Sequence, residues 1–344
     1  MSRPHHRQRR RPPSPIAEPC FAGVDLGRDS LTLTVINHCG DTVLPPTEYA
    51  MSPAGLKKAK AALAAFADLA IAYEPTGNPS GIFLKAFDGH EKLFEINGRV
   101  IRSRSLSMTQ TKTDAADARA IAQILRDITL TEPKRLEQYR AAWCERRANL
   151  TLLATEYAER AEDLRRIKVR ADYLRSTPAP AARQLRRRVT ADLSAALKAQ
   201  QQAKRELVQA AKQCNAEMFE LLLSIPGIGD VMAAALVREI GDIRKFESAD
   251  ALKGFLGVYP ARRQSGKTEY RARLARHGNA RLKAALFMGA QSAARHNPVC
   301  HALFQRLVAK GKKPIVAIGA VMRKLIQLVY GILKNKQPFQ SNFA

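Results

Sequence analysis

The feature of this sequence that most constrains its fold is a change of pattern along the chain. Near the N-terminal end, short apolar runs of strand character alternate with helical stretches; the runs lie at 20–24, 31–36, 42–44, 69–73 and 92–96. A strand hairpin followed by strand–helix alternation predicts a mixed sheet flanked by helices. From about residue 134 the apolar spacing becomes helical. The sequence therefore predicts an α/β fold in the first part and an all-α fold in the rest.

Two long helical patterns occupy the middle of the chain. Apolar residues three and four apart run from Leu150 to Leu174 and again from Leu193 to Leu221. Between them, Pro178 and Pro180 break the helix, because proline cannot continue the helical hydrogen bonding. These features predict an antiparallel coiled-coil hairpin that acts as a spacer, with dimerisation along it as a further hypothesis.

A glycine-rich turn follows the hairpin. The residues Ser224-Ile225-Pro226-Gly227-Ile228-Gly229 stand between two helical patterns and indicate a helix–hairpin–helix. In that motif Gly227 and Gly229 would let backbone N–H groups approach a phosphate. The alternative is a simple connection between helices. Further helices are expected at 231–240, 248–256, 279–295, 299–309 and 313–334, with a polar, basic segment at 260–278.

Charge narrows the class of partner. The formal net charge is +26, from 57 Lys and Arg against 31 Asp and Glu, which favours a polyanion such as nucleic acid. The five cysteines are scattered and form no Cys-x-x-Cys pair, which argues against a disulfide framework and a zinc site. The sequence has no run of 18 or more apolar residues, so no membrane span is expected. Residues 1–19 are basic and lack the apolar core of a signal peptide. We expect a cytoplasmic, nucleoid-associated protein.

Four carboxylates stand out by context. Asp25 and Glu74 each end an apolar strand, and Asp114 and Asp117 share one face of a predicted helix. Converging carboxylates repel one another unless a hard cation neutralises them, and two Mg²⁺ ions can then act on a phosphodiester. Each acid also has a structural alternative: Asp25 could cap a turn, and the helix dipole could favour Asp114. Taken together in a basic chain, the four favour metal-dependent chemistry on nucleic acid.

The order of these motifs resembles a known family. Gly-Val-Asp at Asp25, Tyr-Glu-Pro-Thr-Gly at Glu74 and Lys-Thr-Asp-Ala-Ala-Asp-Ala-Arg from Lys112 to Arg119 resemble the DEDD transposases of the Piv/MooV type, insertion-sequence family 110. The resemblance continues through Pro226-Gly227-Ile228-Gly229, Gln264-Ser265-Gly266 and His277-Gly278-Asn279. After Asp25 and after Ser265 the neighbouring residues depart from the usual family pattern.

The resemblance implies an RNase H-like (RuvC-like) catalytic domain and a C-terminal transposase domain. Its metal-binding tetrad would be Asp25, Glu74, Asp114 and Asp117, and the position of the nucleophilic serine would be Ser265. The implied segments are a disordered arm at 1–19, the catalytic domain at 20–130, the hairpin at 131–222, the transposase domain at 223–336 and a tail at 337–344. Similar proteins act on donor and target DNA with a structured non-coding guide RNA, and a homodimer or homotetramer is expected.

Basic residues surround the serine position. We expect these residues to hold phosphates, together with Lys112 and Arg119 near the acids; they are Arg262, Arg263, Arg271, Arg273 and Arg276. The leading hypothesis is a Mg²⁺-dependent transposase that forms a covalent serine–DNA intermediate. A Holliday-junction endonuclease that uses water is the second, and a non-enzymatic architectural DNA-binding protein is the third.

Overall fold

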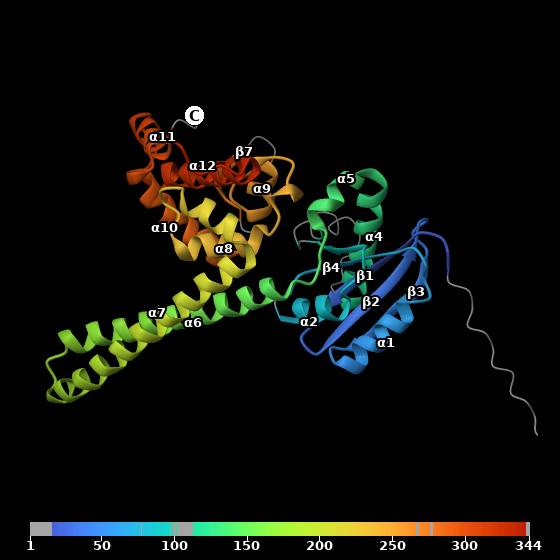
Figure 1. The fold of residues 1–344 in the computed structure, drawn as a ribbon, viewed down its shortest axis with the longest axis horizontal. Helices are drawn as coiled ribbons and strands as arrows, with labels where there is room; N and C mark the ends of the chain where they lie inside the picture. Colours follow the sequence, from blue (N-terminus) through green and yellow to red (C-terminus); the bar gives the residue numbers. More distant parts are fainter. Residues whose placement is uncertain are drawn as a thin grey trace, which may run out of the picture. The chain divides into compact units, whose positions relative to one another are not determined.

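The computed structural model describes residues 16–76, 78–96, 98, 101, 113–265, 268–275 and 278–341. The chain falls into two compact units, Met1–Trp143 and Cys144–Ala344, and each is described by itself (Figure 1). Most of the predicted basic arm, together with Lys112 and Arg276, lies outside the described residues.

A five-stranded mixed sheet forms the centre of the first unit. Its strands are β1 (Cys20–Leu26), β2 (Ser30–Asn37), β3 (Thr42–Ala50), β4 (Leu69–Tyr73) and β5 (Leu93–Glu95). The order across the sheet is β3-β2-β1-β4-β5, with the first three strands antiparallel and β1, β4 and β5 parallel. This confirms the predicted mixed sheet and is consistent with an RNase H-like domain.

Helices cover both faces of this sheet. One face packs on α1 (Pro53–Leu63) and α2 (Asn78–Ala86), where Leu56 and Phe83 join the core around Val24. The opposite face packs on α4 (Asp114–Thr131), whose buried apolar side chains contact the core around Phe21. The unit ends in two short turns of helix, α5 (Pro133–Leu136) and η1 (Glu137–Tyr139).

Strand β3 is longer than the sequence pattern predicts. The expected run ended at Leu44, but the strand continues through Pro45 and Pro46 to Ala50. Proline has no backbone N–H for a sheet ladder, so it is tolerated in an edge strand, which is the position of β3. The two prolines coincide with an irregularity in the pairing of β3 with β2, between the pairs Leu33–Thr47 and Val35–Leu44.

A long helical hairpin opens the second unit. Helix α6 (Glu145–Ser176) and helix α7 (Pro180–Leu223) lie side by side (Figure 1). Their antiparallel direction follows from three contacts, which are Arg146 Nη1 to the Gln213 carbonyl at 3.3 Å, Gln200 Nε2 to Tyr157 Oη at 3.1 Å, and Arg186 Nε to the Leu174 carbonyl at 2.7 Å. The helical stretch predicted from about residue 134 is interrupted after α5 and η1, and the long helix begins at Glu145.

A helical bundle packs on the half of this hairpin that contains the start of α6 and the end of α7. Its helices are α8 (Asp230–Ile240), α9 (Ala249–Leu256), α10 (Ala280–His296), α11 (Pro298–Ala309) and α12 (Pro314–Asn335), with a 3₁₀ turn η2 (Ile243–Lys245). The bundle and hairpin share one core, which includes Leu150, Phe219 and Leu325. Among the described residues, α12 is the one helix long and apolar enough to cross a membrane, and half of that stretch is buried in the core.

The second unit also contains a two-stranded antiparallel ribbon, β6 (Pro260–Ser265) and β7 (Thr268–Leu274). The sequence pattern predicts only a polar, basic segment here. The β6 residues PARRQS lack the alternation of apolar and polar residues that marks a strand in a sequence. The β7 residues TEYRARL do alternate from Glu269 to Leu274, so the sequence carried a signal for this strand that the interpretation as a basic segment passed over.

Candidate functional site

Asp25 and Glu74 occupy matching positions on adjacent parallel strands. Strands β1 and β4 pair in a register that ends at Val24 opposite Tyr73. The residue that follows each of these is an acid, Asp25 after Val24 and Glu74 after Tyr73. Adjacent strands lie about 4.8 Å apart. The register therefore brings together two acids that are 49 positions apart in the sequence.

Both acids belong to the sheet face that α4 covers. Side chains alternate between the faces of a strand, and Phe21 and Ala72 belong to the core on the α4 side. Asp25 and Glu74 share that face by the same period of two. Gly23, two residues before Asp25, shows how close the helix comes: a Cβ atom there would stand 2.0 Å from the Ala118 carbonyl oxygen.

Helix α4 runs antiparallel to β1, so its N-terminal end lies toward Asp25. Near the start of β1, Cys20 pairs with Asn37, and the guanidinium of Arg126 lies against Gly40 in the turn that follows Asn37. Farther along β1, Gly23 meets Ala118. Continuing one helical turn in the same direction leads to Asp114 and Asp117, the acids of the first turn of α4.

The first turn of α4 has a clear local cause. The Thr113 hydroxyl accepts a hydrogen bond from the Ala116 N–H at 3.2 Å, which is the usual N-cap arrangement. Acidic side chains are favoured at a helix N-terminus by the helix dipole. Asp114 is exposed and Asp117 is half-buried. The helix dipole by itself is a sufficient reason for an acid at position 114.

Thr76 ties the segment after β4 to the end of β1. Its hydroxyl donates to the Leu26 carbonyl at 2.9 Å, and its N–H donates to the Ser80 hydroxyl at 2.9 Å. Asp25 and Glu74 thus lie between two fixed contacts, the pairing of Val24 with Tyr73 and the bond from Thr76 to Leu26. The sequence pattern did not single out Thr76, although it belongs to the Glu-Pro-Thr-Gly motif.

A fifth acid lies on the neighbouring strand, on the opposite face of the sheet from Asp25 and Glu74. Buried Tyr73 donates a hydrogen bond from its hydroxyl to Glu95 Oε2 at 2.8 Å, across the paired strands β4 and β5. Sequence reasoning did not select Glu95, although Leu93–Glu95 is also a short apolar run that ends in an acid.

The carboxylates suit a hard divalent cation by donor type. Mg²⁺ prefers oxygen ligands, and all four candidate side chains supply them. Within the described part of the chain, however, no group of three or more His, Cys, Asp or Glu residues is arranged to hold a metal ion. The β1–β4 register and the direction of α4 are the observations that relate the four acids to one end of the sheet.

Arg119 of α4 has a structural partner in β3. Its Nη1 donates to the Thr42 hydroxyl at 2.6 Å, and the side chain is exposed. This bond links the helix to the start of β3, so the predicted phosphate contact remains an expectation.

Ser265 is the last residue of β6 and pairs with Thr268, the first residue of β7. It therefore lies next to the tip of the ribbon, in the second unit, whereas the four acids belong to the first. The ribbon strands carry four of the predicted phosphate-binding residues, which are Arg262, Arg263, Arg271 and Arg273.

Several contacts hold the base of this ribbon. The Ala275 N–H donates to the Tyr259 carbonyl at 3.0 Å, and Lys283 Nζ donates to the Ala275 carbonyl at 2.9 Å. Gly278 has a positive φ of 87°, and a Cβ there would stand 2.5 Å from the Leu256 carbonyl oxygen. Only glycine fits this position without displacing the end of α9.

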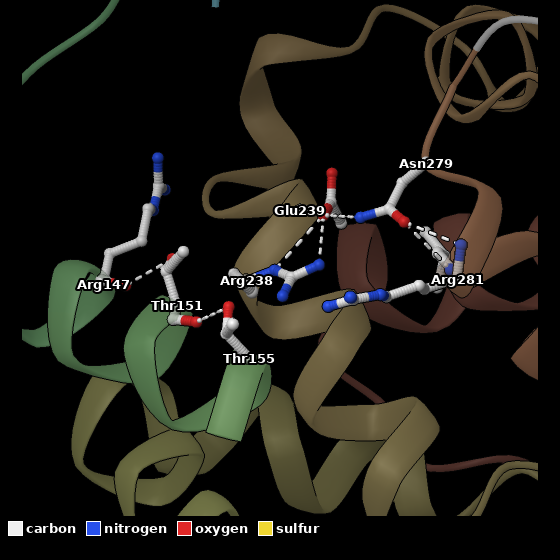
Figure 2. Close-up of polar contacts among 8 residues, drawn as sticks. Arg147, Thr151, Thr155, Arg238, Glu239, Asn279 and Arg281 are labelled. Carbon is white, nitrogen blue, oxygen red and sulfur yellow. Dashed lines mark hydrogen bonds and ion pairs between the residues drawn. The ribbon is translucent and has the colours of Figure 1, made fainter. Parts of the chain in front are cut away.

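Beside this base, Glu239 lies between Arg238 and Asn279 (Figure 2). Glu239 belongs to α8, and Asn279 directly precedes α10. The chain on either side of the ribbon is thus attached to three helices, α8, α9 and α10.

The glycine-rich turn between α7 and α8 packs against α10 and the residue that follows it, Asn297. Gly227 has a φ of 105°, and a Cβ there would stand 2.6 Å from the Ala293 Cβ of α10. The buried Asn297 also donates to the Pro226 carbonyl at 3.3 Å. Gly229 is the N-cap residue of α8 and has open space where a Cβ would stand. A structural reason thus exists for Gly227, and Gly229 leaves room for a ligand.

A groove runs beside the same turn. It has a cavity volume of about 780 Å³ and is lined mainly by polar and basic side chains of α7; the lining is Gln201, Lys204, Arg205, Val208, Gln209, Lys212, Gln213 and Asp230. Lys204 and Asp230 form an ion pair at 2.7 Å within it.

Comparisons with known proteins match both units. Residues 22–173 match a family described as Transposase, of the DEDD type of IS110, and residues 219–305 match the Transposase IS116/IS110/IS902 family. The pilin gene-inverting protein of Moraxella bovis is 35% identical over 122 residues, which are 35% of this chain and 38% of that protein.

Two further relatives point the same way. The transposase for insertion sequence element IS1111A of Coxiella burnetii is 32% identical over 91 residues, 26% of this chain and 25% of that protein. The insertion element IS110 uncharacterized 43.6 kDa protein of Streptomyces coelicolor is 29% identical over 121 residues, 35% of this chain and 30% of that protein. The matched region thus spans less than two fifths of the length of these relatives.

Proposed function

Because the chain belongs to the DEDD transposases of IS110-type insertion elements, we propose that it is the transposase of such an element and that it cuts and rejoins DNA strands. The observation that carries this proposal is the register of β1 with β4, which puts Asp25 beside Glu74 at the end of the sheet toward which α4 points its first turn.

In this proposal Asp25, Glu74, Asp114 and Asp117 hold Mg²⁺, most simply as two ions. The bound metal supplies charge neutralisation and Lewis acidity at a phosphodiester. The sheet supplies position: the β1–β4 register and Thr76 fix two acids, and the capped first turn of α4 presents the other two.

The proposed nucleophile is the Ser265 hydroxyl. Its oxygen attacks a DNA phosphorus, so that a bond from Ser265 Oγ to phosphorus forms and a bond from phosphorus to a DNA oxygen breaks. The serine proton leaves and the departing DNA oxygen gains one. The serine–DNA ester conserves the bond energy, so a second DNA hydroxyl can reverse the step and rejoin the strands.

The partners follow from charge and family. Donor and target DNA, and a structured non-coding guide RNA, would match the net charge of +26. Backbone contacts would come from the arginines of the ribbon and from the turn at Gly227 and Gly229. Coiled-coil packing of α6 with α7, assembly as a homodimer or homotetramer, and a cytoplasmic location at the nucleoid belong to the same proposal.

The test is a recombination assay with purified full-length protein, guide RNA and both DNA substrates in Mg²⁺. We expect Asp25→Asn and Ser265→Ala each to lower strand transfer roughly 1,000-fold or more, and a DNA-linked protein band to vanish in Ser265→Ala. Asp41→Asn and Ser176→Ala, which change an exposed acid and an exposed serine elsewhere, should leave both readouts unchanged.

The rival functions predict different products. Hydrolysed, unlinked DNA with full activity of Ser265→Ala would identify an endonuclease that uses water. DNA binding without any cleavage, indifferent to Mg²⁺ and to Asp25→Asn, would identify an architectural protein. Either result would overturn the serine-transposase proposal.

A further inference from the structure

The ribbon that carries Ser265 is two strands wide, and such a hairpin is marginally stable by itself. Its geometry must therefore come from the attachments at its base. One attachment stands out because it joins helices that are distant in sequence: Asn279 Nδ2 donates to Glu239 Oε1 at 2.7 Å, across 40 residues.

Glu239 Oε1 also accepts two bonds from Arg238, from Nε at 3.2 Å and from Nη2 at 2.7 Å (Figure 2). The Arg238 and Glu239 side chains are 17% and 24% exposed. Charge-assisted hydrogen bonds that are partly shielded from water are stronger than fully exposed pairs. The arginine therefore holds the carboxylate in the position where Asn279 meets it.

Asn279 uses its other polar atom on the helix that follows the ribbon. Its Oδ1 accepts the N–H groups of Arg281 at 2.9 Å and Leu282 at 3.2 Å, which caps the N-terminal end of α10 (Figure 2). One side chain thus bonds α8 through its nitrogen and α10 through its oxygen.

This double use explains the residue type. Serine, threonine or aspartate would cap a helix about as well as asparagine. Among these cap residues, only the amide of asparagine accepts at the cap and also donates N–H bonds to a carboxylate. A cap function alone therefore leaves the choice of asparagine unexplained, whereas pairing with Glu239 accounts for it.

The clamped residue lies close to the ribbon along the chain. Asn279 is five residues after Leu274, the end of β7, and Gly278 between them packs against the end of α9. Lys283, in the first turns of α10, donates to the Ala275 carbonyl. A shift of the start of α10 would therefore reach the ribbon through Ala275 and Gly278.

We infer that Glu239 and Asn279 are positioning residues, a clamp that fixes the base of the ribbon and thereby sets the position of Ser265 for attack on DNA. This inference rests on the proposed role of Ser265 as nucleophile. The two clamp residues contact neither DNA nor the reacting atoms in this proposal; they act through the ribbon.

The experiment uses the full-length protein with guide RNA and DNA in three measurements. Hydrogen exchange of peptides covering 258–275 reports the ribbon, the rate of covalent DNA–protein adduct formation at saturating DNA reports the serine, and a DNA-binding titration reports affinity. The variants are Asn279→Ser, Asn279→Asp, Glu239→Ala and Glu239→Gln, with Glu247→Ala as a control that removes an exposed carboxylate of the same unit.

We expect Asn279→Ser and Asn279→Asp to keep the cap but lose the bond to Glu239. Both should raise exchange in the ribbon and slow adduct formation about 10-fold or more, since one lost bond of about 1.4 kcal/mol is tenfold, while DNA affinity changes less than about 2-fold. Glu239→Ala should behave alike. Glu239→Gln keeps an acceptor for Asn279 and should retain a near-normal adduct rate, as should Glu247→Ala.

Unchanged ribbon exchange in Asn279→Ser and Glu239→Ala would overturn the clamp, whatever the enzyme does. Faster exchange with a normal adduct rate would overturn the link from clamp to serine. Failure of the proposed function gives a different result, namely that wild-type protein forms no adduct and Ser265→Ala retains full strand transfer.

Discussion

The sheet of the first unit and the hairpin of the second are stabilised in opposite ways. In the sheet, β1 is buried along almost its whole length, and α4 approaches so closely that only glycine fits at position 23. In the hairpin, α6 has three buried residues among 32, and its exposed faces carry ion pairs such as Glu162 with Arg165.

This difference indicates where chemistry can be positioned. Reacting groups must be held to within about 0.5 Å, which needs elements whose own positions are fixed by packing. The sheet edge at Asp25 and Glu74 meets that condition through the backbone itself. Most of the α6 surface is in contact with solvent, where individual side chains contribute little to stability and substitutions are tolerated.

The largest expected effect is at Gly23. A Cβ in Gly23→Ala would stand 2.0 Å from the Ala118 carbonyl oxygen and 2.4 Å from the Ala122 nitrogen, so α4 must move away from the sheet. We expect a loss of about 3 kcal/mol in the free energy of unfolding, measured by urea denaturation together with hydrogen exchange in the β1 and β4 peptides.

Gly81→Ala in α2 is the matched control. A Cβ there meets no atom within 4 Å, and alanine is favoured over glycine in a helix, so stability should rise by about 0.5–1 kcal/mol. Equal stability of the two variants would show that the close approach of α4 to β1 is not a constraint.

A smaller effect is expected at Thr76. Thr76→Val removes the hydroxyl that bonds the Leu26 carbonyl, at a cost of about 1 kcal/mol, while the N–H bond to Ser80 remains. Because this contact holds Glu74 beside Asp25, the Mg²⁺ concentration for half-maximal strand transfer should rise about 5-fold.

Thr76→Ser keeps the hydroxyl and should restore the normal Mg²⁺ requirement. A valine variant that loses stability but keeps the wild-type Mg²⁺ requirement would show that Thr76 supports only the fold.

The smallest effect is expected in the hairpin. A hydrogen bond from Arg165 lowers the pKa of Glu162 from 4.5 to about 2. A carboxyl whose folded pKa is depressed stabilises the folded state above its unfolded pKa, and this contribution is lost as pH falls from 4.5 toward 2. The carboxyl is fully exposed, so water screens the interaction.

Glu162→Gln should therefore melt at the wild-type temperature within error at pH 7, where the contribution of the pair is fully present. In thermal melts from pH 7 to pH 3, any small difference between the two proteins should shrink as pH falls below 4.5. A melting temperature several degrees below wild type at pH 7 would show that ion pairs on the surface of the hairpin contribute substantially to its stability.

The sequence predicted elements whose apolar content is high. Strands β1, β2 and β4 were visible because buried strands read as short apolar runs, and the hairpin was visible because Pro178 and Pro180 separate two helical periods. Asp25 and Glu74 were selected because each ends an apolar strand, where a ligand can sit. Asp114 and Asp117 were selected because a spacing of three puts both on one face of a helix.

The remaining features depend on tertiary contacts. The position of Asp25 next to Glu74 could be inferred only from the register of β1 with β4, which no local sequence pattern specifies. The helix expected from residue 134 is interrupted because Arg140 bridges to Phe94 and the Ala141 N–H donates to the Leu93 carbonyl, so this segment pairs with β5 instead. In the ribbon, β6 has weak local strand character, whereas β7 alternates apolar and charged residues and could have been predicted.

The prolines of β3 have a consequence for self-association. Pro45 and Pro46 are adjacent and N–H groups alternate between the two sides of a strand, so together they deny this margin of the sheet a donor that an incoming strand would need. The segment at 140–141 occupies the margin beside β5. Neither border offers a ready template for β-augmentation by another copy. Within the described residues, copies of this protein would therefore not associate by extending the five-stranded sheet.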